Sequence, residues 1–432
     1  MKKRLLFIAY FYPPLGGPGV QRPIKTIKYL KKSGWEIDVL TVGDIQFHSY
    51  DFELLKESKA DNIFRTNSWD FMYLFKKLKP KKGNNHFQNI YFNAPEKLKK
   101  FVRGFFPIDD KIGWFPFAYQ KAISLHKKRK YDALISTIGP YTAGVLGYCL
   151  QKRLKIPFFV DYRDHWTLHS YPQYKFRLLF WHAKNIETKM LKNAHGVFVI
   201  SHLMKEMMIS HFGEHLKNKT NVVYNGFDED DFTKIDNNML KFSSPDFIIR
   251  YVGNFYGNRS VRYFIDVLED LKQKNEIPDS VRIEFVGNYF AETKKLLKSK
   301  ILSTHIKIIP QVNHKEAIFH MLTADLLLLF IPSADKEDFM TGKLFEYIRA
   351  GVPIFAMIPT NGEPAKILRE FGHKYICEME DTQSIKKYLL EFIELNKNIK
   401  LNSDFKHDFR YSREAQTKEF DQLLRGEVRE NS

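Results

Sequence analysis

The chain has 432 residues, more than one compact core normally holds, so two or three domains are expected. Its composition, with 44% hydrophobic and 27% charged residues, is that of a globular protein. The formal net charge of +18 favours a polyanionic partner such as nucleic acid, anionic lipid or a phosphorylated substrate. Only Cys149 and Cys377 are present, which argues against a disulfide scaffold or a cysteine metal cluster.

Apolar runs in this chain are too short to span a bilayer, which takes ~20 residues. The N-terminal stretch does resemble a signal peptide, because basic residues precede an apolar segment that ends at Tyr12. Pro13-Pro14 and a glycine loop follow, however, instead of a cleavage site with small residues. We therefore expect a cytoplasmic protein whose first residues form a buried strand.

The first part of the chain alternates strand and helix patterns. Arg4–Tyr12 predicts a buried strand, Val20–Ser33 a helix, and Trp35–Val42 alternates as a second strand. The pattern recurs in later strands and helices: Tyr131–Thr137, Ala143–Leu154, Ile156–Asp161, Lys175–Leu191, Gly196–Ser201 and Asn221–Tyr224. This order predicts a doubly wound parallel sheet in an α/β domain covering residues 1–227.

Residues 45–113 interrupt this alternation and are interpreted as an insertion. Within it, Phe71–Phe106 carries nine Lys or Arg and one acid, Glu96, interleaved with aromatic residues. Basic residues near anionic lipid contribute about 1 kcal/mol each, and aromatic rings favour the membrane interface. The segment therefore predicts contact with an anionic membrane surface, with a solvated basic face as the alternative.

A second alternation follows an acidic segment, residues 228–246, that is interpreted as a linker. We read its first acids, from Asp228 to Asp231, as a solvated face and not as a metal site. Strands and helices then alternate to residue 410: Phe247–Gly253, Val261–Gln273, Val281–Gly287, Ile306–Ile309, His314–Leu322, Asp325–Phe330, Lys343–Ala350, Pro353–Met357 and Glu363–Phe371. The remainder, residues 411–432, predicts a charged helix.

Two loops in the first domain have the composition of binding sites. In PPLGGPGVQR, Gly16 and Gly17 let a backbone approach a ligand closely, and the next helix directs its amides at the same space. The spacing is not that of dinucleotide binders, and a tight turn without a ligand is the alternative. In DYRDHW, Arg163, Asp164 and His165 follow a buried strand, where open α/β sheets bind ligands. An Arg163–Asp164 ion pair that holds the loop is the alternative there.

The segment DFMTGKLFEYIRAGVPI in the second domain carries the strongest motif. Thr341, Gly342 and Lys343 open a helix whose first amides attract an anion, and Lys343 adds a positive charge. Glu346 lies one turn further on. The alternative is an amphipathic helix on which Lys343 and Glu346 form a solvent-facing pair. An earlier loop, YVGNFYGNRS, offers Arg259 as a phosphate ligand or a surface cation.

In this order, the motifs resemble those of the retaining GT-B glycosyltransferases of family four, including bacterial surface-polysaccharide enzymes. The resemblance implies two facing Rossmann-like domains with an interdomain cleft, a nucleotide-sugar donor such as a UDP- or GDP-sugar, and neither metal nor cofactor. It implies that Asp338 and Glu346 are catalytic, and that Glu346 contacts ribose hydroxyls and Asp338 the transferred sugar. The diphosphate would lie near Gly16, Gly17, Arg259 and the residues Thr341, Gly342 and Lys343.

The chain departs from the family pattern in several places, two in the first domain and two in the second. His165 replaces the proline of an RDPW sequence, and Tyr141 stands where relatives place a histidine. Asn254 replaces an arginine, and Asp338 replaces a glutamate. The resemblance still implies that Asp164 is catalytic and that Arg163, His165 and Tyr141 lie on the acceptor side.

The expected activity is transfer of a sugar to a hydroxyl of a lipid-linked saccharide during surface-polysaccharide synthesis. We expect a peripheral protein on the inner face of the plasma membrane, without specific nucleic-acid binding, whose final helix crosses back to the first domain. Two alternatives stay open: a nucleotide-sugar epimerase of the same fold and a non-enzymatic polyanion-binding protein.

Overall fold

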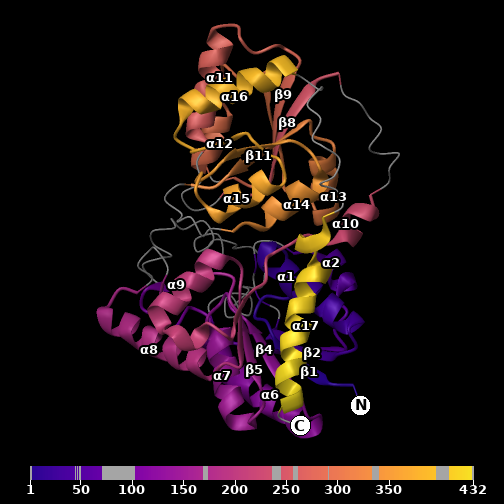
Figure 1. The fold of residues 1–432 in the computed structure, drawn as a ribbon, viewed down its shortest axis with the longest axis vertical. Coiled ribbons are helices and arrows are strands. Elements are labelled where there is room, and N and C mark those ends of the chain that lie inside the picture. The colour runs from indigo at the N-terminus through magenta and orange to yellow at the C-terminus, as the bar shows by residue number, and fades with distance from the viewer. Residues whose placement is uncertain are drawn as a thin grey trace, which may run out of the picture. The chain divides into compact units, whose positions relative to one another are not determined.

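The computed structural model describes residues 2–43, 45, 47, 50–70, 103–168, 174–235, 245–255, 261–289, 291–332, 340–395 and 408–430. They form two compact units. Unit 1 is Met1–Tyr224 with Arg413–Ser432, and unit 2 is Asn225–Ser412. Each contains one parallel sheet flanked by helices (Figure 1), which confirms the predicted α/β class with two Rossmann-like sheets. Among the described residues, no helix is both long and apolar enough to cross a bilayer.

The sheet of unit 1 has the strand order β3-β2-β1-β4-β5-β6-β7, and all its described pairs are parallel. The strands are β1 (Arg4–Ile8), β2 (Glu36–Val42), β3 (Asn62–Thr66), β4 (Ala133–Thr137), β5 (Phe158–Asp161), β6 (Gly196–Val199) and β7 (Thr220–Val222). The helices are α1 (Pro18–Lys32), α2 (Phe52–Glu57), α6 (Phe115–Lys128), α7 (Thr142–Leu154), α8 (Arg177–Asn193) and α9 (His202–Phe212). The order in which successive strands are added reverses between β1 and β4, which makes their carboxyl ends the topological switch point.

The structure differs from the predicted insertion at residues 45–113 in the first part of that range. Residues 62–66 form β3, which pairs with β2 at the edge of the sheet, and α2 connects the two strands. The sequence gives little sign of β3 because an edge strand needs no continuous apolar run, and here four residues are half-buried and Arg65 is exposed. Asp51 caps α2 by accepting a hydrogen bond from Leu54 N at 3.1 Å. Most of the basic aromatic segment, residues 71–102, lies outside the described residues.

The sheet of unit 2 has the order β10-β9-β8-β11-β12-β13, again with parallel pairs. The order in which successive strands are added reverses between β8 and β11. Its strands are β8 (Phe247–Val252), β9 (Val281–Val286), β10 (Ile306–Ile309), β11 (Leu326–Phe330), β12 (Ile354–Met357) and β13 (Ile376–Cys377). Its helices are α10 (Glu229–Thr233), α11 (Arg262–Gln273), α12 (Ala291–Leu297), α13 (His314–Leu322), α14 (Gly342–Ala350), α15 (Glu363–Glu370) and α16 (Thr382–Leu395). The apolar run of β11 is buried along its whole length, as a central parallel strand requires.

The acidic start of the predicted linker is not a solvated face. Asp228 caps α10, accepting a hydrogen bond from Asp230 N at 3.3 Å. Glu229 pairs with Arg349 of α14, whose Nε lies 2.6 Å from Oε2. Asp231 Oδ2 lies 3.2 Å from His314 Nε2 at the start of α13. The acids therefore fasten α10 within unit 2, and their partners lie too far along the chain to be recognised from sequence.

The helix α17 (Arg413–Glu430) belongs to unit 1 and lies beside α1 (Figure 1). Trp35 Nε1 donates a hydrogen bond to Asp421 Oδ1 at 2.6 Å, and Arg425 donates to the carbonyl of Ser33. The ring of Phe420 packs 3.8 Å from that of Phe198, centroid to centroid. The end of the chain thus completes the core of the unit in which the chain begins.

Acidification should destabilise unit 2 through His373. This residue follows α15 and is buried, which lowers its pKa from 6.5 to about 4. The unfolded chain binds a proton near pH 6.5, so below that pH the unfolded state holds more protons and folding stability falls as pH decreases. We expect the free energy of unfolding of unit 2 to fall by about 2 kcal/mol between pH 7 and pH 5 through this residue. The check is the thermal midpoint of unit 2 across this pH range.

The control is His373→Gln, which removes the titrating group and should flatten the pH dependence between pH 7 and 5. His320 in the same unit also has a pKa lowered by burial and contributes a residual slope of the same sign. An unchanged slope in His373→Gln would show that His373 does not titrate as the structure implies.

Candidate functional site

The switch point of unit 2 lies at the carboxyl ends of β8 and β11. Open α/β sheets bind ligands at this position. Gly253 and Asn254 follow β8, and the first residues of α14 reach the same place, because the Lys343 side chain contacts both Tyr251 and Gly253. Two predicted site residues of these loops, Arg259 and Asp338, lie outside the described residues.

Lys343 is fixed at this edge by two neighbours. Its Nζ donates a hydrogen bond to Tyr251 Oη at 3.0 Å and lies 4.8 Å from the centroid of the Tyr251 ring. Gly253 leaves the space that the lysine fills, because a Cβ atom there would lie 1.9 Å from Cε and 2.1 Å from Nζ. Gly253 also has φ +137°, a conformation that favours glycine. The loop after β8 thus holds the ammonium group at the switch point.

The first turn of α14 adds a second positive potential beside Lys343. Thr341 is the N-cap residue, with extended backbone at φ −94° and ψ 140°, and its side chain makes no capping hydrogen bond in the described part of the chain. The first amides of a helix lack intrahelical acceptors and carry partial positive charge. With Gly342 at the first helical position, these amides can be approached closely by an anion. The amides and Lys343 together suit a phosphate or diphosphate group.

Glu346 lies one turn further along α14, next to a histidine that the sequence did not identify. Its Oε1 is 3.7 Å from His314 Nε2, and the same nitrogen is 3.2 Å from Asp231 Oδ2. His314 thus faces carboxylates from α10 and α14. Tyr347 joins α14 to β8, since its hydroxyl accepts a hydrogen bond from Val252 N at 2.9 Å. The helix carrying Lys343 and Glu346 is therefore positioned by three neighbouring elements.

Asn254 stands where the family resemblance predicts an arginine. Its Oδ1 accepts a hydrogen bond from Asn288 N at 2.7 Å, and Asn288 Nδ2 donates to Gln311 Oε1 at 2.7 Å. Gly287, at φ +146°, packs against this loop, because a Cβ there would lie 2.4 Å from the Gly253 carbonyl oxygen. The asparagine thus ties the loops after β8 and β9 together and adds no charge.

Replacing Gly253 with alanine should displace Lys343. The new Cβ would occupy the position of Cε and Nζ, so the ammonium must leave Tyr251. If Lys343 binds an anionic donor, we expect donor affinity to fall at least tenfold, about 1.4 kcal/mol. Titration calorimetry with the donor nucleotide measures the change.

Gly34→Ala is the matched control for this substitution. Gly34 also has a positive φ, +94°, but a Cβ there meets no atom within 4 Å. The control therefore carries similar backbone strain without displacing a side chain, and its donor affinity should equal that of the wild type. Equal donor affinities in Gly253→Ala and the wild type would show that Lys343 does not contribute to donor binding.

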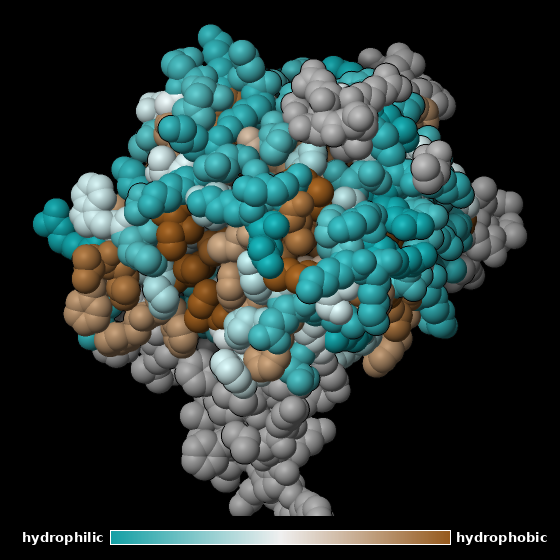
Figure 2. Space-filling model, turned by 90° about the horizontal axis from the view of Figure 1, so that it is seen from below, coloured by the Kyte–Doolittle hydropathy of each residue, from teal (hydrophilic) through white to brown (hydrophobic). Residues whose placement is uncertain are grey.

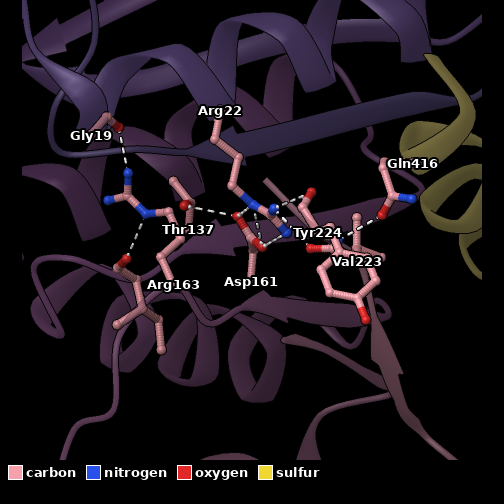
Figure 3. Close-up of polar contacts among 9 residues, drawn as sticks. Gly19, Arg22, Thr137, Asp161, Arg163, Val223, Tyr224 and Gln416 are labelled. Atoms are coloured by element: carbon pink, nitrogen blue, oxygen red, sulfur yellow. Dashed lines mark hydrogen bonds and ion pairs between the residues drawn. The ribbon is translucent and has the colours of Figure 1, made fainter. Parts of the chain in front are cut away.

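In unit 1, Arg163 connects the loops at the corresponding switch point. It follows β5, and its Nε and Nη2 donate to the carbonyls of Ile138 and Gly139, each at 3.0 Å. Nη1 donates to the carbonyl of Gly19 in the first turn of α1, so the side chain extends from β5 to the glycine-rich loop (Figure 3). Burial lowers the pKa of Arg163, while the carboxylates of Asp164 and Asp161 act in the opposite direction. The predicted loop-holding role is therefore carried by contacts with backbone carbonyls.

Asp161 and Arg22 form a buried ion pair next to Arg163 (Figure 3). Arg22 Nη2 lies 2.7 Å from Asp161 Oδ1, and the side chains of both are only 2% exposed. Arg22 Nη1 also donates to the carbonyls of Val223 and Tyr224 at 2.9 and 3.0 Å, and Thr137 Oγ1 donates to Asp161 Oδ2 at 3.0 Å. The pair thus joins α1, β4, β5 and the segment after β7.

The other predicted residues of unit 1 surround these loops. Asp164 is exposed, and His165 and Tyr141 are half-buried. Tyr141 donates its hydroxyl hydrogen to the carbonyl of His165 at 2.7 Å and stacks on Trp166 with ring centroids 5.2 Å apart. Gly16 is buried, and Gly17 is the N-cap residue of α1 with φ 95°. The structure therefore brings the loop after β1, the loop after β4 and DYRDHW together.

The chain matches two family models. One, described as Glycosyltransferase Family 4, matches residues 24–231, and the other, described as Glycosyl transferases group 1, matches residues 233–410. The boundary between them falls in α10. No curated protein sequence matches the chain.

Several solved structures share the fold over the whole chain. Sucrose-phosphate synthase from Thermosynechococcus elongatus has 13% identity and a TM-score of 0.66, with full coverage of both chains. WaaG, a glycosyltransferase involved in lipopolysaccharide biosynthesis, has 14% identity and a TM-score of 0.54, with 98% of each chain covered. UDP-GlcNAc 2-epimerase from Neisseria meningitidis, solved with UDP-GlcNAc, has 14% identity and a TM-score of 0.54, covering 98% of this chain and all of that one. Likeness at this identity shows the fold alone.

Proposed function

Because the chain belongs to the GT-B glycosyltransferases of the family-four type, we propose that it transfers a sugar from a UDP- or GDP-sugar to a hydroxyl of a lipid-linked saccharide. The reaction retains the anomeric configuration and needs no metal ion. The proposal depends chiefly on one observation: Lys343 and the first turn of α14 lie at the switch point of unit 2, against Gly253.

The leaving diphosphate gains negative charge as its bond to the sugar breaks. Fixed amide dipoles and cations that already point at this charge stabilise it without rearranging. In unit 2 these groups are the amides of the first turn of α14 and the Lys343 ammonium, which take the place of a divalent ion. Arg259, outside the described residues, is proposed as a second cation on the same diphosphate.

Glu346 is proposed to accept hydrogen bonds from the ribose hydroxyls of the donor. A carboxylate suits this task because its two oxygens accept bonds from neighbouring hydroxyls. His314, which lies 3.7 Å from Glu346 Oε1, helps to orient this carboxylate. Asp338, outside the described residues, is proposed to contact hydroxyls of the transferred sugar.

Unit 1 is proposed to bind the acceptor. Arg163 ties the loop after β4 to the first turn of α1, and Asp164, His165 and Tyr141 lie around it. Asp164 is the exposed carboxylate of this group and is proposed to act on the acceptor hydroxyl. Gly16 and Gly17 are proposed to let the loop after β1 approach the donor diphosphate.

A lipid-linked acceptor on the inner face of the plasma membrane is the finer part of the proposal. The excess of basic residues in Phe71–Phe106 supports it, since basic and aromatic residues favour an anionic membrane interface. WaaG, which shares the fold, is involved in lipopolysaccharide biosynthesis. Surface-polysaccharide assembly is the process in which such an acceptor is used.

Product analysis tests the proposed activity against the alternatives. The protein is incubated with UDP- and GDP-sugars in the presence and absence of a lipid-linked saccharide. We expect donor consumption only with acceptor, an anomeric configuration retained in the product by NMR, and no effect of a chelator. Conversion of the donor sugar without acceptor would indicate an epimerase, for which the shared fold of UDP-GlcNAc 2-epimerase is the argument. Absence of any turnover would favour a polyanion-binding protein.

A further inference from the structure

The start of α8 and the segment before α6 expose a cluster of large apolar side chains. Leu178 is 79% exposed, Trp181 56%, Phe176 51% and Phe105 44%. The rings of Phe105 and Phe176 lie 5.7 Å apart, centroid to centroid, which joins the two segments into one surface. Figure 2 shows hydrophobic residues gathered at the left edge of its view, the side on which Figure 1 labels α8. These four residues are called the α8 patch.

The α8 patch is held in place by the buried side of the helix. Ala183, Glu187, Met190 and Leu191 are the buried residues of α8, so its first turns present the apolar residues outward. Lys175 N donates a hydrogen bond to the carbonyl of Gly104 at 2.9 Å, which ties the start of α8 to the segment of Phe105. A contiguous exposed apolar patch, especially one with polar residues around it, marks an interaction site.

Basic side chains surround the α8 patch. Lys175 Nζ lies 4.6 Å from the centroid of the Phe105 ring, and Lys184 Nζ lies 5.6 Å from that of Trp181. Arg103 and Arg177 are exposed at the ends of the two segments, and Arg103 also lies 3.6 Å from Asp110 Oδ2. The only acid between residues 174 and 193 is Glu187, whose carboxylate is buried and accepts hydrogen bonds from Tyr162 and Thr167. The surface is therefore apolar at its centre and positive around it.

We propose that the α8 patch inserts into the interfacial region of an anionic lipid bilayer. Trp and Phe rings favour the interface, and leucine gains free energy on leaving water. The surrounding lysines and arginines each add about 1 kcal/mol near anionic lipid. This surface would bring unit 1 to a lipid-linked acceptor. Its role in sugar transfer therefore rests on the proposed function. Vesicle binding can be measured without turnover.

The test is flotation of the full-length protein with vesicles of phosphatidylcholine containing phosphatidylglycerol. We expect the wild type to float, and the double substitution Leu178→Gln with Trp181→Gln to weaken vesicle binding at least tenfold. Phe52→Gln is the matched control: Phe52 is 63% exposed on α2 and is not part of the patch. Its flotation should equal that of the wild type. Because all three residues are exposed, thermal midpoints should not change.

Equal flotation of the double variant and the wild type would overturn the proposal, as would a wild type that ignores anionic vesicles. Self-association through the patch would also overturn it, and would appear as a concentration-dependent size that the double variant lacks. Donor binding in the double variant should match the wild type. A failure of donor binding in the wild type would refute the proposed function and leave the vesicle result unaffected.

Discussion

Replacing Lys343 with alanine is expected to lower sugar transfer by about two to three orders of magnitude, the usual loss when a fixed donor to developing negative charge is removed. The ammonium is held at the switch point by its hydrogen bond to Tyr251 and by the space at Gly253. Turnover measured at saturating donor isolates the effect on the leaving diphosphate, because saturation compensates for weaker ground-state binding.

The control for this variant is Lys366→Ala. Lys366 is exposed on α15 of the same unit, so its loss changes the net charge equally but leaves the switch point intact. We expect its turnover to equal that of the wild type. If Lys343→Ala also keeps wild-type turnover, Lys343 does not stabilise the leaving group and its proposed role is wrong.

The second large effect is expected in Asp161→Ala, which should destabilise unit 1 by about 3–5 kcal/mol. The substitution leaves the Arg22 guanidinium buried without its carboxylate, and removes the acceptor of the Thr137 hydroxyl. A buried charge that has lost its partner is far more destabilising than the loss of a solvated pair. Chemical unfolding monitored by the tryptophans of unit 1 measures the change.

Glu36→Ala is the control for Asp161→Ala. Glu36 pairs with Arg4 at 2.6 Å, but both side chains are about one-third exposed, and exposed pairs typically contribute about 0–1 kcal/mol. We expect a small shift in the midpoint for this variant. A similarly small shift for Asp161→Ala would mean that Arg22 finds water or another acceptor, and the buried pair would not organise the loops around Arg163.

The regular α/β framework was predictable from sequence because its strands are continuous apolar runs and its helices are amphipathic. β11 is an example: Leu326–Phe330 is entirely apolar, entirely buried and preceded by Asp325. The edge strand β3 was missed because an edge needs little apolar surface. The short helix α10 was missed because its stability comes from Arg349 and His314, more than eighty residues away along the chain.

The candidate site was predictable where one short segment supplies both backbone and charge. Thr341, Gly342 and Lys343 form the start of α14 as expected, and the helix pattern alone places Glu346 one turn further on. The neighbours that fix these residues were not predictable, because contacts such as Gly253 with Lys343 depend on the tertiary fold. In unit 1, a signal for the buried pair did exist: Asp161 ends an apolar strand, and a carboxylate in that position needs a buried partner. The sequence does not show that Arg22 is that partner.

The most direct test of the account is calorimetric titration of unlabelled nucleoside diphosphate into the wild type and into Lys343→Ala, with the nucleoside and its monophosphate as comparisons. The account predicts that the diphosphate binds most tightly to the wild type, and that Lys343→Ala reduces its affinity at least tenfold while changing nucleoside binding little. Equal diphosphate affinity in the two proteins, or equal binding of nucleoside and diphosphate by the wild type, would contradict the assignment of α14 to the diphosphate.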